Sequence, residues 1–188
     1  MSSILELPSV RRRVAAISVE TYQAWSEQGR VDERTELLRG VIIKKMPKSP
    51  LHVFLVDRIY ELARAVVWLG QTIRMEQPLT LADSEPEPDI AIVEGRPEDF
   101  RRDHPSSALL AIEVAVSTED VDREKIEIYA EAAVAEYWLV LPASGVIEMY
   151  SRPLGSTYQE FRIARGGDIL VSSVLPKLRV NVSELFSS

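Results

Sequence analysis

Two short apolar runs constrain the fold of this chain more than any other feature of its sequence. Residues 89–93 are apolar after their first residue, Asp89, and residues 108–116 are apolar except for one residue, Glu113. Runs of this length, preceded by stretches rich in turn-forming residues, are typical of buried strands. They predict a sheet whose central strands are covered by other elements.

Segments with helical periodicity precede and follow these runs. The longest begins with a Ser-Pro pair and covers residues 49–70, and shorter ones cover residues 19–28 and 118–133. Further segments predict a hairpin and additional strands: 34–46, 73–81, 136–141, 146–151 and 158–164, with a strand and a terminal turn over 168–186. This order predicts an α/β (α+β) class, with a mixed central sheet flanked by helices.

Several kinds of chemistry have no support in the sequence. The chain has no cysteine, which excludes disulfides, thiolate metal sites and a cysteine nucleophile. It also lacks the G-x-S-x-G, G-x-x-x-x-G-K-[ST], G-x-G-x-x-G and H-E-x-x-H motifs. Serine hydrolases, P-loop nucleotide hydrolases, dinucleotide-binding enzymes and zinc proteases are therefore not indicated.

The organisation of the chain is simple. With no repeat and no long linker, we expect an N-terminal arm over residues 1–17 and a single domain over residues 18–188.

No apolar run reaches the roughly 18 residues that a membrane span requires, and no signal-peptide core follows the N-terminal arginines. We expect a cytoplasmic protein without a membrane partner.

The acidic residues of the two apolar runs are the candidate functional residues. A buried carboxylate such as Glu113 costs several kcal/mol unless a cation or hydrogen bonds compensate for its desolvation. Asp89 begins the other strand, and Lys125, in the helix after the strand of Glu113, is long enough to reach the same strand end. Two carboxylates and an ammonium are the minimum for a divalent-cation site that hydrolyses a phosphodiester.

Each of these residues also has a plain structural interpretation. Asp89 could mark a turn at a strand start, Glu113 could face solvent on an edge strand, and Lys125 could be a solvated helix residue. His52, at the start of the long helix, could cap or pack there or contribute to the site as an accessory residue. His104 is expected to be an ordinary loop residue.

The candidate acids and Lys125 belong to an ordered set of motifs that extends over residues 18–186. It comprises Glu36 to Gly40, His52, Pro88 to Val93, Ala111 to Val114, Asp122 to Lys125, Tyr129 and Glu136 to Val140. Together these motifs resemble the Uma2 family of endonucleases, which belongs to the PD-(D/E)XK, or restriction-endonuclease-like, superfamily. The resemblance implies a restriction-endonuclease-like fold.

The resemblance also implies roles for individual residues. Asp89 and Glu113 would bind Mg²⁺ or Mn²⁺, Lys125 would be the catalytic lysine, and Glu36 would be a further acid at the metal or its water. In the wider superfamily the lysine follows the second acid by two positions, where this chain has Ala115. The pattern therefore fits only if the lysine has moved to the following helix.

Three functions remain open at this point. The leading one is a metal-dependent endonuclease, a hydrolase that cleaves DNA. A catalytically inactive binding or regulatory module with the same fold is favoured by the net charge of −7, although basic residues could still line one groove: Arg11 to Arg13, Lys44, Lys45, Lys48, Arg101 and Arg102. The third treats the acids as surface charge and Tyr137-Trp138 as the seam of a homodimer.

Overall fold

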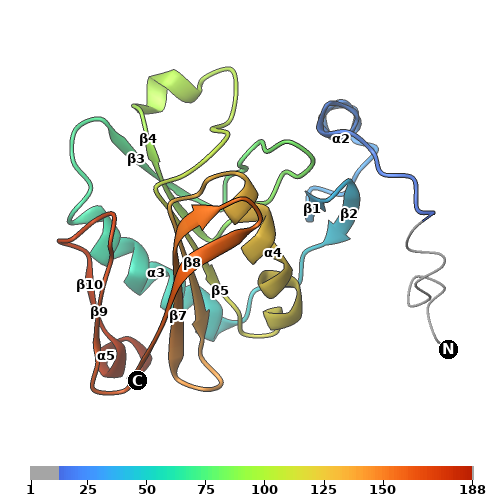
Figure 1. The fold of residues 1–188 in the computed structure, drawn as a ribbon. Coiled ribbons are helices and arrows are strands. Elements are labelled where there is room, and N and C mark those ends of the chain that lie inside the picture. The colour runs from blue at the N-terminus through green and yellow to red at the C-terminus, as the bar shows by residue number, and fades with distance from the viewer. Residues whose placement is uncertain (1–12, 188) are drawn as a thin grey trace, which may run out of the picture.

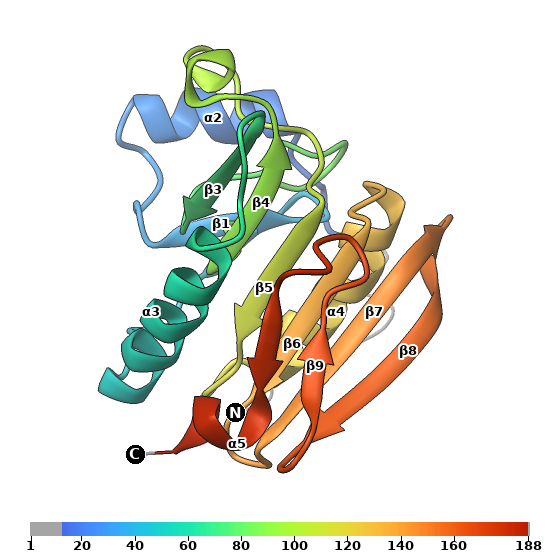
Figure 2. The same cartoon turned by 90° about the vertical axis from the view of Figure 1, so that its left-hand side faces the viewer.

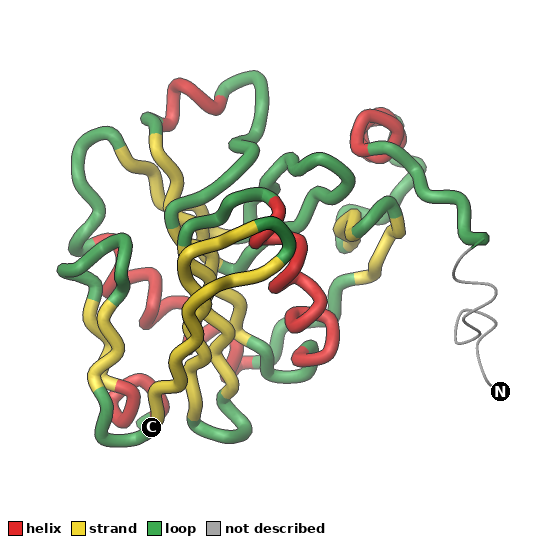
Figure 3. The backbone as a smooth tube through the Cα atoms, viewed as in Figure 1, coloured by secondary structure: helices red, strands yellow, loops and turns green. Residues whose placement is uncertain are grey.

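The computed structural model describes residues 13–187. Residues 1–12, most of the predicted N-terminal arm, lie outside the described residues, so the domain boundary near residue 18 stays a prediction. Figure 1 shows the fold, and Figure 3 shows how helices and strands alternate along the backbone. Within this described part, no helix combines the length and the hydropathy needed to cross a membrane.

A six-stranded mixed sheet forms the centre of the molecule. The strands lie in the order β3-β4-β5-β6-β7-β8, and all neighbours are antiparallel except the parallel pair β5 and β6. Their bounds are Gln71–Met75, Ile90–Glu94, Leu110–Val114, Glu136–Leu141, Val146–Leu154 and Thr157–Arg165. The two apolar runs become β4 and β5, in the interior of the sheet, as their composition predicts.

Both faces of the sheet are covered (Figure 2). Helix α3 (Pro50–Arg64) packs on one face together with the C-terminal elements β9 (Ile169–Val171), β10 (Arg179–Asn181) and α5 (Val182–Phe186). Helix α4 (Glu119–Glu131) links β5 to β6 and covers the other face. Side chains of β6 alternate between the two cores, with Trp138 on the α3 side and Tyr137 on the α4 side.

A separate hairpin lies beside the sheet with helix α2 (Val19–Glu27). Its strands are β1 (Thr35–Leu38) and β2 (Val41–Lys44), and the two turn residues between them, Arg39 and Gly40, have positive φ angles of 53° and 72°. A Cβ at Gly40 would lie 2.5 Å from the Cβ of Ala16, so this position requires glycine. Backbone hydrogen bonds between Leu37 and Glu85 join the hairpin to the loop before β4.

Three predicted elements differ from the structure. Helix α3 ends at Arg64 rather than at Gly70, because the chain tightens where Val66 donates its N–H to Ala63. The predicted strand character of residues 79–81 is wrong, since Leu79 is buried from within a loop. The C-terminal segment contains two strands and a helix instead of one strand and a turn.

Between residues 13 and 187, the remaining loops hold no long regular element. The segment after β4 contains one short 3-10 helix, η2 (Pro97–Phe100). Turns at Ser144-Gly145 and Gly155-Ser156 connect β6 to β7 and β7 to β8. The third functional hypothesis is wrong in its structural premise, because Tyr137 and Trp138 are completely buried within the chain and cannot form a dimer seam.

Candidate functional site

The pairing of β4 with β5 brings Asp89 and Glu113 together. These strands are antiparallel with Ile90 opposite Ile112, so Asp89 at the start of β4 lies across from Glu113 near the end of β5. The backbone N–H of Asp89 donates to Glu113 Oε2 at 3.4 Å, and the N–H of Val114 donates to Asp89 Oδ2 at 2.7 Å. Since β5 is an interior strand, Glu113 is not an exposed edge-strand acid.

Lys125 reaches the same place from α4. Its Nζ lies 3.0 Å from Glu113 Oε1 and 3.1 Å from Glu36 Oε2 on β1. The lysine side chain is only 4% exposed, so the interpretation of Lys125 as a solvated helix residue is wrong. Helix α4 follows β5 in the chain and packs on β6, β7 and β8, and the Lys125 side chain reaches back to Glu113 on β5.

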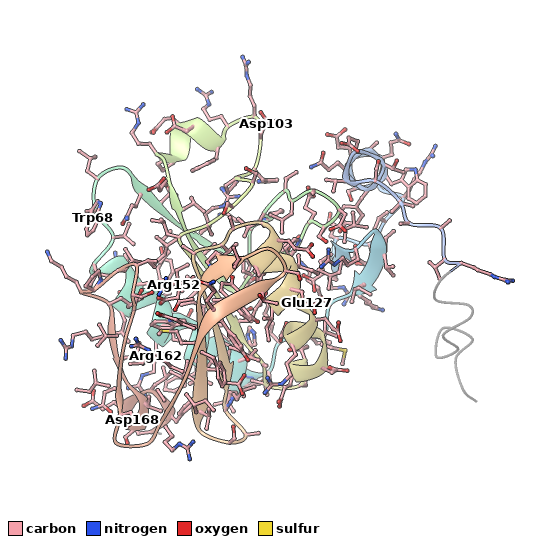
Figure 4. All side chains as sticks on the ribbon, viewed as in Figure 1. Trp68, Asp103, Glu127, Arg152, Arg162 and Asp168 are labelled. Carbon is pink, nitrogen blue, oxygen red and sulfur yellow. The ribbon has the colours of Figure 1, made fainter. Side chains whose placement is uncertain are left out.

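The two histidines occupy different parts of the molecule. His52, near the N-terminus of α3, places Nε2 3.1 Å from the carboxylate of Asp89, while its Nδ1 is buried without a hydrogen-bond partner. His104 lies in the loop at the opposite end of β4 and accepts a hydrogen bond from Arg74 at 2.9 Å. Figure 4 shows its neighbour Asp103 at the outer tip of that loop.

Two further residues complete the buried cluster and were not predicted. The hydroxyl of Tyr129 donates to Glu113 Oε1 at 2.9 Å, and Asp122 Oδ1 lies 3.3 Å from the ammonium of Lys125. Thr118 donates to the other oxygen of Asp122 at 2.6 Å. The available signal was the spacing of Asp122, Lys125 and Tyr129, which places all three on one helix face.

The cluster carries more negative than positive charge. Burial raises the pKa of Glu113 well above its usual range. The ammonium of Lys125 acts to lower this pKa, whereas the neighbouring carboxylates of Asp122, Asp89 and Glu36 act to raise it further. Burial also raises the pKa of Asp122. Burial alone would lower the pKa of Lys125, but Glu113, Glu36 and Asp122 outweigh it and raise that pKa well above its usual range. Lys125 is therefore held as an ammonium among four carboxylates.

A cavity of about 120 Å³ opens in front of these acids. Asp89, Glu113 and Asp122 line it, whereas Lys125 and Glu36 are not part of its wall and lie behind the carboxylates. The other lining residues come from the β2–α3 connection, from the β5–α4 connection and from nearby loops: Ile43 to Ser49, His52, Glu76, Glu87, Val116 to Thr118 and Val121.

The donor atoms at this cavity fit a hard divalent cation. Among residues 13–187 no group of three or more His, Cys, Asp or Glu side chains is arranged to hold a metal ion. Mg²⁺ and similar cations are commonly held by only one or two carboxylates, with water and substrate phosphate as the other ligands. The adjacent carboxylates of Asp89 and Glu113 match that ligand set, and a bound cation would offset the excess negative charge.

Comparisons with known proteins bear on the fold and on the family of this chain. A crystal structure of a putative nuclease belonging to DUF820 from Anabaena variabilis superposes with a TM-score of 0.72 at 19% sequence identity, covering 86% of this chain and 96% of that one. This similarity confirms the predicted fold class. No curated protein matches the chain. The family model "Uma2: Putative restriction endonuclease" matches residues 19–183, nearly the whole described chain, and the protein therefore belongs to the Uma2 family.

Proposed function

We propose that this chain is a Mg²⁺- or Mn²⁺-dependent endonuclease that hydrolyses phosphodiester bonds within DNA. The observation that carries the proposal is the meeting of Asp89 and Glu113 on one wall of a cavity, with Lys125 directly behind them. The Uma2 family and the nuclease-like fold support the same reaction class.

Asp89 and Glu113 are the residues that would hold the cation. When bound, a divalent cation lowers the pKa of a coordinated water and neutralises charge that develops on the phosphate. Asp89 is oriented by the N–H of Val114 and by His52, and Glu113 is oriented by Lys125 and Tyr129. These contacts fix both carboxylates before any substrate arrives.

Lys125 acts in this proposal as a fixed positive charge. The carboxylates of Glu113, Glu36 and Asp122 raise the pKa of Lys125, which favours its ammonium form. This ammonium holds the same three carboxylates in place. Glu36, which the resemblance assigns to the metal or its water, contributes by holding Lys125 from the side of β1.

Cleavage of supercoiled plasmid DNA tests the proposal. We expect the purified protein to convert plasmid to nicked or linear forms with Mg²⁺ or Mn²⁺ and to leave it intact in EDTA. Asp89→Asn and Glu113→Gln should each lower the rate by about a hundredfold or more, since each removes a charge that acts at the reacting phosphate. Asp57→Asn, at an exposed position of α3, is the matched control. Cleavage that is equally fast in both site variants would disprove the assignment.

A second candidate is a nuclease-fold module that binds without turnover, and the net charge of −7 favours it because DNA enzymes usually present basic surface. Titration calorimetry with Mn²⁺ separates the two candidates. Tight binding of the ion without cleavage of DNA or RNA would identify the module.

A further inference from the structure

Positive charge is concentrated at the mouth of the acidic cavity. Three of the chain's five lysines lie close together in the sequence: Lys44 ends β2, and Lys45 and Lys48 lie in the connection between β2 and α3. All three line the cavity onto which Asp89 and Glu113 open. In a chain with a net charge of −7, this short basic segment faces the acidic wall directly.

Two of these lysines are paired with acids on the same rim. Lys45 forms an ion pair with Glu87, and Lys48 forms one with Glu76, which directly follows β3. The four side chains are between 21% and 40% exposed. Ion pairs in contact with solvent contribute little stability, so other anions can replace either carboxylate at low cost.

Of the other basic residues that the sequence suggested for this groove, the described ones, Arg13, Arg101 and Arg102, do not line the cavity. Arg102 lies beside His104 at a different cavity, and Arg101 is not part of the wall described above. Arg11 and Arg12 lie outside the described residues. Within residues 13–187, the lysines of this segment are therefore the only Lys or Arg side chains that line the cavity.

We propose that Lys45 and Lys48 bind backbone phosphates of the nucleic acid next to the phosphate that enters the cavity, and that Glu87 and Glu76 compete for these lysines in the free protein. The inference rests on the proposed function for the identity of the polyanion. The acidic wall alone repels a phosphate backbone, and these lysines provide the attraction that offsets this repulsion. A phosphate oxygen accepts from the same ammonium groups as these carboxylates, so the nucleic acid competes with Glu76 for Lys48 and with Glu87 for Lys45.

The proposal predicts that substitutions of the two partners of the Lys48–Glu76 ion pair change the Kd for DNA in opposite directions. Binding of a fluorescein-labelled DNA duplex is measured by anisotropy over a range of salt concentrations, in EDTA and again with Mg²⁺, with the probe checked on a gel. Lys48→Gln should raise the Kd by about threefold to tenfold and reduce the salt slope by about one, as expected for one lost phosphate contact. Glu76→Gln should lower the Kd by about twofold to fivefold, since it frees Lys48 and removes one negative charge from the cavity lining while leaving Asp89, Glu113 and Asp122 unchanged.

Two controls make the result specific. Lys177→Gln, an exposed lysine between β9 and β10, makes the same charge change away from the cavity and should leave the Kd unchanged within about twofold. In the Lys48→Gln background, Glu76→Gln should lower the Kd by less than it does in the wild type. Equal Kd values for the wild type, Lys48→Gln and Lys177→Gln would overturn the inference, as would a higher Kd for Glu76→Gln.

Failure of this inference is distinguishable from failure of the proposed function. Plasmid cleavage that depends on Asp89 but not on Lys48, together with unchanged binding, would overturn the lysine assignment alone. The predicted binding pattern without any cleavage would support the lysine assignment and overturn the nuclease activity.

Discussion

At Lys125, one ammonium group contacts three buried carboxylates that come from separate parts of the chain. Glu36 lies on β1, Glu113 on β5 and Asp122 one helical turn away on α4. Within residues 13–187 no other cationic side chain forms an ion pair with these three acids. The stability of the site therefore depends on this residue more than on any single acid.

Replacing Lys125 with methionine should destabilise the protein by about 3 to 5 kcal/mol, because it leaves buried carboxylates without their cation. Urea unfolding followed by circular dichroism measures the change, with Lys177→Met as the control. Adding Glu113→Gln to the Lys125→Met variant should recover part of the loss, because it removes one of the uncompensated charges. A Lys125→Met variant as stable as the wild type would show that the ammonium does not compensate for these acids.

The site residues differ in how far the sequence could identify them. Asp89 and Glu113 are conspicuous because a carboxylate is costly within an apolar strand, and the resemblance adds Glu36 and Lys125. Asp122 lies in the first turn of α4 with Glu119 and Asp120, where acids favour a helix N-terminus. Its second role, as a partner of Lys125, depends on how α4 packs in the fold and is visible only in three dimensions.

Among the elements, α4 is held on the sheet by a contact on the side opposite to the site. Arg123 donates two hydrogen bonds to Glu148 on β7, at 2.8 and 2.9 Å, and Tyr150 donates a third to the same carboxylate at 2.6 Å. The hydrogen bond from Arg123 is the main reason why the pKa of Glu148 lies below its ordinary value of 4.5. This contact holds in position the helix that carries Lys125.

The lowered pKa of Glu148 predicts a pH-dependent contribution to stability. A depressed folded-state pKa stabilises the protein above the unfolded-state pKa, and this stabilisation is lost as the pH falls through the folded-state value. Glu148→Gln should therefore cost about 1 kcal/mol at neutral pH, given that Arg123 is partly exposed, and the difference from the wild type should shrink below pH 4.5. Urea unfolding at several pH values measures this difference.

The control for this experiment is Glu94→Gln, at the exposed end of β4. At neutral pH it should change the free energy of unfolding by less than Glu148→Gln does. A Glu148→Gln penalty that is constant from neutral to acid pH would contradict the assigned contact.

For the molecule as a whole, the sequence predicted which segments form the sheet and the helices that cover it better than it predicted where those segments end. The apolar character of residues 89–93 and 108–116 reflects burial on both faces, and this property is local enough to be read from the chain. The end of α3 at Arg64 and the loop around Leu79 depend on packing between distant segments, which periodicity does not report. The antiparallel pairing of β4 with β5 likewise decides whether the two acids meet.

Anomalous diffraction from crystals soaked in Mn²⁺ tests the central claim most directly, because it locates the ion without requiring activity. We predict one anomalous peak in the cavity, within coordination distance of carboxylate oxygens of both Asp89 and Glu113, and no such peak in crystals of the Asp89→Asn variant. A fully soaked wild-type crystal with no peak beside these two carboxylates, or with manganese bound only elsewhere, would contradict the account.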